Sequence, residues 1–118
     1  MTCLIQLIIC NTQKITQSIL QFRDARDWAQ YHTGKDISMC LSVEAGELLE
    51  LFLWKKDPDE VDRAKLCDEL ADVLYSAFLL AAYYELDLRE IVLAKLEKNK
   101  KKYPVDKARG RNEKYDTL

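Results

Sequence analysis

Hydrophobic residues recur along the chain every three or four positions, which is the period of an amphipathic α-helix. Four stretches carry this pattern: from 12 or 16 to 31, from 37 to 54, from 57 to 84, and from 87 to just before Pro104. Only three glycines and two prolines interrupt the chain, which permits long helices and disfavours a loop-rich β fold. We therefore predict an all-α, four-helix-type bundle.

Capping residues mark several helix boundaries. Asp57, Pro58 and Glu60 form a complete start signal, with an N-cap, a proline at the first helical position and a capping-box acid. Asp87 opens the last stretch with the same capping-box logic. Gly34 is expected to end the first helix.

The remaining segments are assigned from their composition. Residues 73–84 are nearly all apolar, so we expect them to be buried on most sides. Residues 1–11 form either a packing arm or the first turns of the first helix; they lack the features of a signal peptide and are too short to span a bilayer. Residues 105–118 are expected to be an extended tail. The length fits one domain covering 1–118.

The net charge of −2 hides an uneven distribution. Residues 95–118 contain nine basic and four acidic side chains, whereas the rest of the chain contains nine basic and sixteen acidic ones. An acidic body with a basic tail suits a metal site beside a phosphate site, and it suits a nucleic-acid polymer poorly. A solvated tail with no partner is the alternative. No membrane partner is expected.

The cysteines favour a reducing compartment, and we expect a cytoplasmic protein. They are scattered through apolar helical stretches without a CxxC pair, which is typical of small buried hydrophobic residues. The four are Cys3, Cys10, Cys40 and Cys67. A single histidine, His32, argues against a zinc site.

Two pairs of acidic residues carry the candidate chemistry. Glu44 and Glu47 lie three residues apart in the second stretch, and Glu69 and Asp72 do so in the third. Each pair therefore projects from one helix face. The positions four residues after Glu44, Glu47 and Glu69 are apolar, so these carboxylates have no basic partner on their own helix. If the two helices face each other, these four carboxylates converge with Glu50, which requires a cation between them.

Ligands that are all oxygen atoms favour a hard divalent ion, Mg²⁺ or Mn²⁺. Such an ion can bridge a triphosphate and lower the pKa of a bound water. Glu47 or Glu50 could then orient or deprotonate the attacking water, and the sequence does not choose between them. A lone ExxE is common and usually solvated, but a second acidic pair on the next helix makes the pattern more specific.

With these pairs the chain resembles the MazG-like, all-α nucleotide pyrophosphohydrolases, in particular the branch that includes dCTP pyrophosphatase. The resemblance covers about residues 22–118. The matching runs are RDWxxYH from Arg26, VExGELxELFxW from Val43, DELADVL from Asp68, KxxxNxxxYPV from Lys95, ARG from Ala108 and KY from Lys114.

The resemblance implies a magnesium-dependent enzyme that converts a (deoxy)nucleoside triphosphate to monophosphate and pyrophosphate. It also implies a homodimer or a dimer of dimers, with active sites shared between subunits. The implied metal ligands are Glu44, Glu47, Glu69 and Asp72, with Glu50 as an additional acid. The implied nucleotide contacts are Trp28, His32 and Trp54 around base and sugar, and Lys95, Asn99 and Tyr103 elsewhere. Arg109 and Lys114 are candidates for becoming ordered over the triphosphate.

One position departs from the family pattern. Relatives often have a tyrosine four residues after the last acidic ligand, where this chain has Ser76. The adjacent Tyr75 points about 100° away on a helix. The base preference therefore stays open at this stage.

The function that these features favour best is clearance of unwanted nucleotides, with a dCTP-like substrate. A dUTP-type or broad-specificity pyrophosphatase is the alternative within the same chemistry. The alternative of another class is a non-catalytic, antitoxin-like regulatory or interaction module, in which the acidic face would be a binding surface.

Overall fold

The computed structural model describes residues 2–57 and 60–118, with side chains from residue 11 onward. The helices are α1 (Thr2–Asp24), α2 (Gly34–Glu50), α3 (Arg63–Tyr83), α4 (Leu88–Lys102) and α5 (Val105–Ala108), with 3-10 turns η1 (Ala29–Tyr31) and η3 (Tyr115–Thr117). The described residues contain no strand, which confirms the all-α prediction. The chain divides into two compact units, Met1–Leu86 and Asp87–Leu118.

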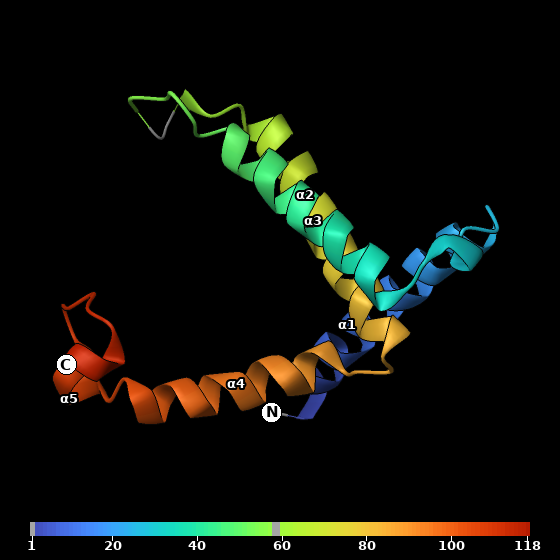
Figure 1. Cartoon of the computed structure of the whole chain (residues 1–118). Coiled ribbons are helices and arrows are strands. Elements are labelled where there is room, and N and C mark those ends of the chain that lie inside the picture. Colours follow the sequence, from blue (N-terminus) through green and yellow to red (C-terminus); the bar gives the residue numbers. More distant parts are fainter. Residues whose placement is uncertain (1, 58–59) are drawn as a thin grey trace. The chain divides into compact units, whose positions relative to one another are not determined.

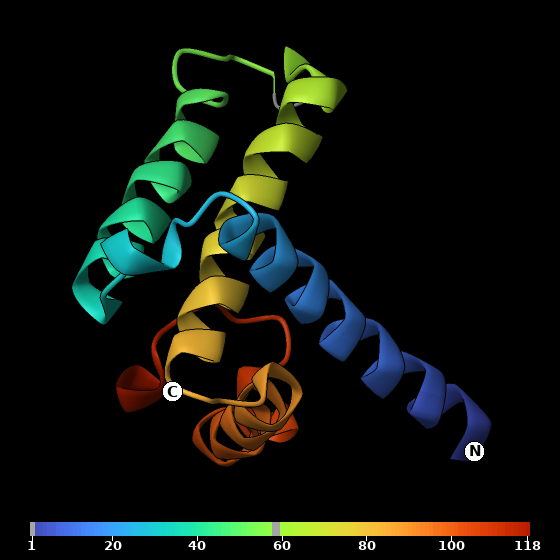
Figure 2. The same ribbon diagram turned by 90° about the vertical axis from the view of Figure 1, so that its right-hand side faces the viewer.

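In the first unit, α2 and α3 lie side by side as an antiparallel hairpin, and α1 packs against α3 (Figures 1 and 2). The small core lies where the N-terminal part of α2 meets the C-terminal part of α3. Its most buried side chains are Ile37, Leu79 and Ser76, which are 2%, 3% and 4% exposed. Burial of these residues fixes the hairpin that carries both acidic pairs.

The first helix has different boundaries from those predicted. Residues 2–11 belong to α1, so they are the first turns of that helix. Its other end comes at Asp24, because Asp27 takes a left-handed φ of 53°. The N–H groups of Asp27 and Trp28 donate to the carbonyls of Asp24 and Arg23 at 3.0 and 3.2 Å. This is a Schellman motif, which usually contains glycine. Because aspartate takes that place here, no glycine marks the end of the helix in the sequence.

Gly34 does not end the first helix but is the first residue of α2. Thr33 caps α2: its hydroxyl accepts from the Asp36 N–H at 3.2 Å, and the Asp36 carboxylate accepts from the Thr33 N–H at 3.0 Å. These reciprocal bonds form a capping box. At its other end α2 stops at Glu50, four residues short of the predicted end at Trp54.

The predicted start of the third helix at Asp57 is wrong. Asp62 is the N-cap of α3, and its carboxylate accepts hydrogen bonds from the N–H groups two and three residues later, at 2.9 and 3.3 Å. The carbonyl of Asp57 instead accepts from the Glu60 N–H at 3.1 Å in a separate turn. Pro58, expected at the first helical position, lies outside the described residues.

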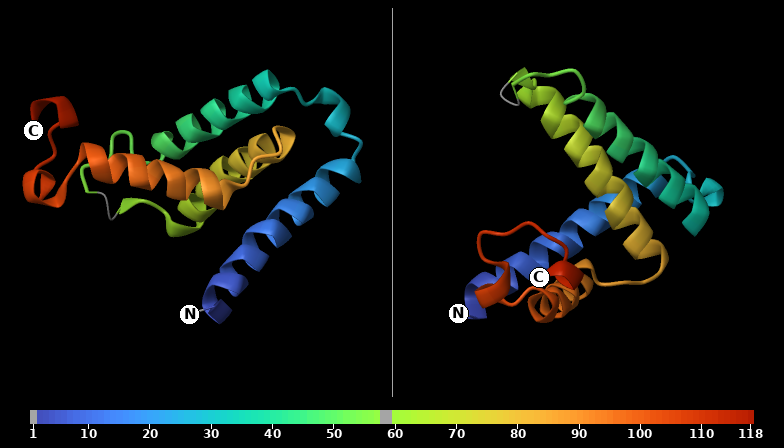
Figure 3. Two further views of the ribbon diagram at one scale, coloured as in Figure 1. Left: turned by 90° about the horizontal axis from the view of Figure 1, so that it is seen from below. Right: turned by 60° about the vertical axis from the view of Figure 1, so that its left-hand side comes forward.

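The second unit starts as predicted. The Asp87 carboxylate caps α4 by accepting from the Glu90 N–H at 3.1 Å. Residues 105–118 differ from the expected extended tail because they form α5 and η3 (Figure 3). The tail folds back within this unit, so that the rings of Tyr103 and Tyr115 meet edge to face with centroids 5.9 Å apart.

The apolar segment 73–84 is less buried in a single chain than expected. Only Ser76, Leu79 and Ala81 in this segment are buried, whereas Leu74 and Tyr84 are 49% and 58% exposed. The expectation of burial on most sides is therefore wrong for one copy of the chain. In the first unit α1 and α2 pack against α3, and these two helices leave part of its surface uncovered.

The cysteines that can be placed are also not buried. Cys40 and Cys67 are exposed free thiols, contrary to the prediction. The side chains of Cys3 and Cys10 lie outside the described ones. Within the described part of the chain, no helix combines the length and the apolar character needed to cross a membrane.

Candidate active site

Three of the four predicted metal ligands converge between α2 and α3. Glu44, Glu47 and Glu69 each offer one carboxylate oxygen, and these oxygens all lie within 4.8 Å of one another. The antiparallel hairpin produces this cluster because it sets the middle of α2 level with the first half of α3 (Figure 2). We call these three residues the carboxylate cluster. Asp72 lies one helical turn beyond Glu69 on α3.

The carboxylate cluster is electrostatically unbalanced. Desolvation raises the pKa of Glu44, and a hydrogen bond and negative charge from Glu47 raise it further. Desolvation also raises the pKa of Glu69, followed by the charges of Glu47 and Asp72. One oxygen each of Glu44 and Glu69 is buried without a hydrogen-bond partner among the residues described. None of the ion pairs in that part of the chain includes a member of the cluster.

These properties fit a hard divalent cation. Buried polar atoms are normally hydrogen-bonded, so two orphaned carboxylate oxygens facing like charges need another partner. The donor set consists only of carboxylate oxygens, which suits Mg²⁺ or Mn²⁺ and not a thiolate- or imidazole-binding metal. Glu50 lies one turn beyond Glu47 on α2, and its charge contributes to the raised pKa of Glu69.

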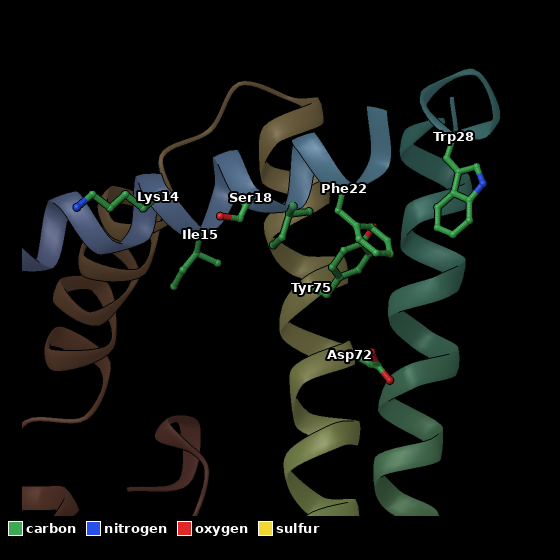
Figure 4. Close-up of a pocket in the computed structure, with 8 residues that line it drawn as sticks. Lys14, Ile15, Ser18, Phe22, Trp28, Asp72 and Tyr75 are labelled. Atoms are coloured by element: carbon green, nitrogen blue, oxygen red, sulfur yellow. The ribbon is translucent and has the colours of Figure 1, made fainter. Parts of the chain in front are cut away.

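A pocket of about 570 Å³ lies between α1 and α3 (Figure 4). Its walls include Ile15, Ile19, Phe22, Trp28 and Tyr75. The Phe22 ring meets the rings of Trp28 and Tyr75 edge to face, with centroids 5.7 and 6.2 Å apart. Such a wall of aromatic and aliphatic side chains suits a flat, apolar ligand surface.

Asp72 connects this aromatic pocket to the carboxylate cluster. It lines the pocket, and Figure 4 places it next to Tyr75 on the same helix. Its negative charge also acts on Glu44 and Glu69. The first unit therefore offers an apolar pocket and an acidic cluster, with Asp72 lining the pocket and acting electrostatically on the cluster.

Trp28 and His32 also line a second, smaller cavity of about 110 Å³. The sequence resemblance placed both residues in one nucleotide pocket, and the fold does bring them together. The Nδ1 atom of His32 is buried and has no hydrogen-bond partner in the described part of the chain. Tyr75 forms a wall of both cavities, and burial raises the pKa of its hydroxyl group.

Trp54 is not part of either cavity in the same copy of the chain. It follows the C-terminal end of α2, whereas Trp28 precedes the N-terminal end. The 17 residues of α2 separate these ends by about 25 Å, at about 1.5 Å per residue. The Trp54 side chain is 97% exposed, and its backbone takes a left-handed φ of 66°.

The remaining predicted nucleotide contacts belong to the second unit. Lys95, Asn99 and Tyr103 follow at four-residue intervals along α4 and its C-cap, where the Tyr103 N–H donates to the Asn99 carbonyl at 2.8 Å. The Lys114 ammonium lies 5.9 Å from the ring centroid of Tyr115, which in turn contacts Tyr103. The fold of the tail thus brings Tyr103 and Lys114 to the same ring.

Arg109 takes a different position, as the C-cap of α5. Lys114 also forms an ion pair of 3.4 Å with Asp116, in which both side chains are more than half exposed. Their contact with a triphosphate stays a prediction.

Several residues of the aromatic pocket were not singled out in the sequence. Ile15, Ile19 and Phe22 follow the helical period, so the pattern indicated ordinary core residues. Tyr75 was expected to point away from the site. Lys14 and Ser18 also line the pocket. The only available signal was the proximity of Phe22 to the RDWxxYH run, because the rest depends on how α1 crosses α3.

Residues 39–118 match the model of the MazG-like family. The dCTP pyrophosphatase 1 proteins of Mus musculus and Homo sapiens are each 39% identical to the chain over 105 residues. These matches cover 83% of this chain, and the chain spans 62% of the length of these curated relatives.

A solved structure gives an independent comparison. A pyrophosphatase from Archaeoglobus fulgidus superimposes with a TM-score of 0.75 and is 35% identical in sequence. The match covers 80% of this chain and 93% of that one. The structural match and the sequence matches therefore each cover most of the chain.

Proposed function

Because the chain belongs to the MazG-like family, we propose that it hydrolyses nucleoside triphosphates to the monophosphate and pyrophosphate. The observation that carries this proposal is the position of Asp72, which lines the aromatic pocket and acts electrostatically on the carboxylate cluster. A nucleotide has the same two-part character, since its base is flat and apolar on its faces and its phosphates bind cations.

We assign Mg²⁺, with Mn²⁺ as a substitute, to the carboxylate cluster together with Asp72. Glu44, Glu47 and Glu69 would hold the ion with their carboxylate oxygens, which the two orphaned oxygens support. When bound, the ion neutralises charge on the triphosphate and makes a bound water more acidic. Holding it would also offset the desolvation of Glu44 and Glu69 and the repulsion among the carboxylates, the two causes that raise their pKa values.

The protein residues then divide the remaining work. The aromatic pocket would hold the base against Phe22, Trp28 and Tyr75, and its apolar walls would exclude water from the base. Orientation by the pocket would place the bond between the α and β phosphates near the carboxylates. Glu50 lies one turn from Glu47 and is not among the residues that would hold the ion, so it would be free to take the proton of the attacking water.

For the second unit we propose phosphate contacts. Its basic segment presents amino, amide, hydroxyl and guanidinium groups, from Lys95, Asn99, Tyr103, Arg109 and Lys114. The cationic groups would neutralise charge on phosphate oxygens, and the amide and hydroxyl groups would donate hydrogen bonds to them. The joint contact of Tyr103 and Lys114 with Tyr115 supports a shared role for the first two.

We further propose a dCTP-like deoxynucleotide as substrate and clearance of unwanted nucleotides in the cytoplasm as the role. The similarity to proteins named dCTP pyrophosphatase 1 supports this choice, over an alignment that covers 62% of those proteins. A dUTP-type or broad-specificity activity would use the same residues and differ only in the base preference.

We also propose that the active form is a homodimer or homotetramer. Among the described side chains, a single copy buries few apolar ones and leaves Leu74, Tyr83 and Tyr84 of the apolar segment 73–84 exposed. Trp54 is 97% exposed and is separated from Trp28 by the whole of α2, about 25 Å long, so it would contribute to the pocket of a neighbouring copy. Sharing of sites between copies would allow this solvent-exposed tryptophan to contact a nucleotide.

The test is a panel of nucleoside triphosphates assayed for monophosphate and pyrophosphate, with Mg²⁺ and with a chelator. We expect turnover only with the metal, and the highest kcat/KM for a deoxycytidine nucleotide. Glu47→Gln and Asp72→Asn should each lower kcat/KM by about 100-fold or more. Glu90→Gln is the matched control, because Glu90 is an exposed acid of α4.

The outcomes separate the alternatives. Equal turnover of uridine and cytidine nucleotides would favour the dUTP-type or broad-specificity activity. Failure of the metal-loaded protein to release pyrophosphate from every nucleotide would contradict the proposal and favour a non-catalytic module. In that case Glu47→Gln and Asp72→Asn would leave function intact.

A further inference from the structure

The smaller cavity lies beneath the turn that carries Trp28 and His32, between α2 and α3. Ile37 and Leu79, two of the most buried residues of the protein, form its floor. It shares two walls, Trp28 and Tyr75, with the aromatic pocket. A ligand held against those two rings could therefore extend into this cavity.

Ser76 controls the size of this cavity. Its side chain is 4% exposed and lines the cavity from α3, where the neighbouring residues from 77 to 80 are Ala, Phe, Leu and Leu. A side chain of leucine size at position 76 would occupy space that the serine leaves open. Interiors are normally packed without such gaps, so the cavity calls for an explanation.

His32 gives the cavity a polar atom that lacks a partner within the described part of the chain. Its Nδ1 atom is buried and lacks a hydrogen-bond partner among residues 2–57 and 60–118, although buried polar atoms are usually paired. Among the described residues that line the cavity, His32 is the one with an acidic or basic side chain. A phosphate would lose its hydration there without compensation, so the cavity suits an uncharged ligand edge that can hydrogen-bond.

The volume of the cavity limits the size of the ligand edge that can enter it. The cavity measures about 110 Å³. For comparison, a cavity of about 150 Å³ in another protein encloses one benzene molecule. The space therefore accepts part of one six-membered ring and not a fused pair of rings.

We propose that Ser76 is a specificity-determining residue, because it keeps open a cavity that receives the edge of a pyrimidine base beside the His32 imidazole. This inference rests on the proposed function and deepens it, since it states how the base is selected. The ring faces would contact Trp28 and Tyr75, and the edge would hydrogen-bond to Nδ1 of His32. A purine would be held only in the larger aromatic pocket.

The test compares Ser76→Ala, Ser76→Thr and Ser76→Leu in steady-state assays with dCTP and dATP. For dCTP, KM should rise in the order Ala, Thr, Leu, reaching at least about tenfold for Ser76→Leu, with kcat within about twofold. For dATP, KM should not follow this order. Ser42→Leu is the matched control, because it makes the same change at an exposed position of α2.

Binding of deoxycytidine monophosphate, measured by calorimetry without metal, gives a readout independent of turnover. It should weaken in the same order as KM rises. Thermal unfolding identifies any variant that fails to fold, and Ser76→Thr, which adds one methyl group, keeps the test decisive if Ser76→Leu does not.

Two failures are distinguishable. If the wild-type protein hydrolyses and binds dCTP and its product, but the folded Ser76 variants match it, the role of Ser76 is wrong and the proposed function stands. If the wild-type protein neither hydrolyses nor binds any nucleotide, the proposed function fails and the inference fails with it.

Discussion

Glu44 on α2 and Glu69 on α3 each have a buried carboxylate oxygen with no partner among the described residues, and one carboxylate oxygen of each lies within 4.8 Å of the other. Burial and mutual repulsion make this pair unfavourable in the protein without metal. We expect Mg²⁺ to raise the Tm measured by calorimetry, because a ligand of the folded state stabilises that state. Glu44→Gln or Glu69→Gln should raise the Tm of the metal-free protein and remove the response to Mg²⁺.

Glu90→Gln is the control for this experiment and should leave both the Tm and its increase with Mg²⁺ unchanged. An equal increase in the wild-type protein and in Glu44→Gln would show that Mg²⁺ binds elsewhere.

The same pair predicts a pH dependence of stability. The pKa values of Glu44 and Glu69 are raised in the folded state above the ordinary 4.5. The folded protein therefore binds more protons than the unfolded chain over an interval that begins near this value, and these groups destabilise the fold as pH rises through it. The stability that the two protonated groups contribute to the fold is fully present below the unfolded pKa and is lost as the pH rises through the folded pKa.

We expect the difference in Tm between the metal-free wild-type protein and the double variant Glu44→Gln, Glu69→Gln to widen from pH 4 to pH 7, with the variant more stable at pH 7. Excess Mg²⁺ should reverse the order at pH 7, because it binds the ionised carboxylates of the wild type only. A constant difference across this range would contradict the assigned pKa directions.

Replacing glycine by alanine should have opposite effects on stability at the two glycines of α2, Gly34 and Gly46. A Cβ atom at Gly34 would overlap the Tyr84 hydroxyl group and lie 2.8 Å from the ring carbon that bears it, whereas one at Gly46 would meet nothing within 4 Å. Gly34→Ala should lower the free energy of unfolding by about 1–3 kcal/mol through overpacking. Gly46→Ala should raise it by about 0.5–1 kcal/mol, because alanine favours a helix interior.

Urea denaturation of both glycine variants provides the measurement, and each variant serves as the control for the other. Stabilisation by Gly34→Ala would mean that the Tyr84 ring moves aside at little cost.

Trp28 and Trp54 allow a test of shared active sites. If each site uses Trp28 from one copy and Trp54 from another, Trp28→Ala and Trp54→Ala should both be weakly active alone. An equal mixture, unfolded and refolded together, should recover about a quarter of wild-type activity, because half of the dimers are mixed and each of these has one intact site of two. Pyrophosphate release measures the recovery.

Refolding each tryptophan variant alone controls for losses during the procedure. A mixture no more active than its parents would exclude a pocket that combines these two residues from different copies.

Local features of the chain were readable before the fold was known. The Asp87 cap, the four-residue spacing of Lys95, Asn99 and Tyr103, and the three-residue spacing within each acidic pair follow from hydrogen bonds and side-chain positions within one helix. The end of α1 at Asp27 was missed, because the Schellman motif there uses aspartate where the usual signal is glycine.

The sequence alone determined that the chain is helical and that Glu44 and Glu47 share a helix face, because both properties arise from contacts between residues three or four positions apart. Only the tertiary structure decided that Glu69 joins them, that Tyr75 and Ser76 line cavities beside Trp28, and that Trp54 lies beyond the other end of α2. These relationships depend on the register in which α3 packs against α2 and α1. That register is set by burial of distant residues such as Ile37 and Leu79, which no local spacing encodes.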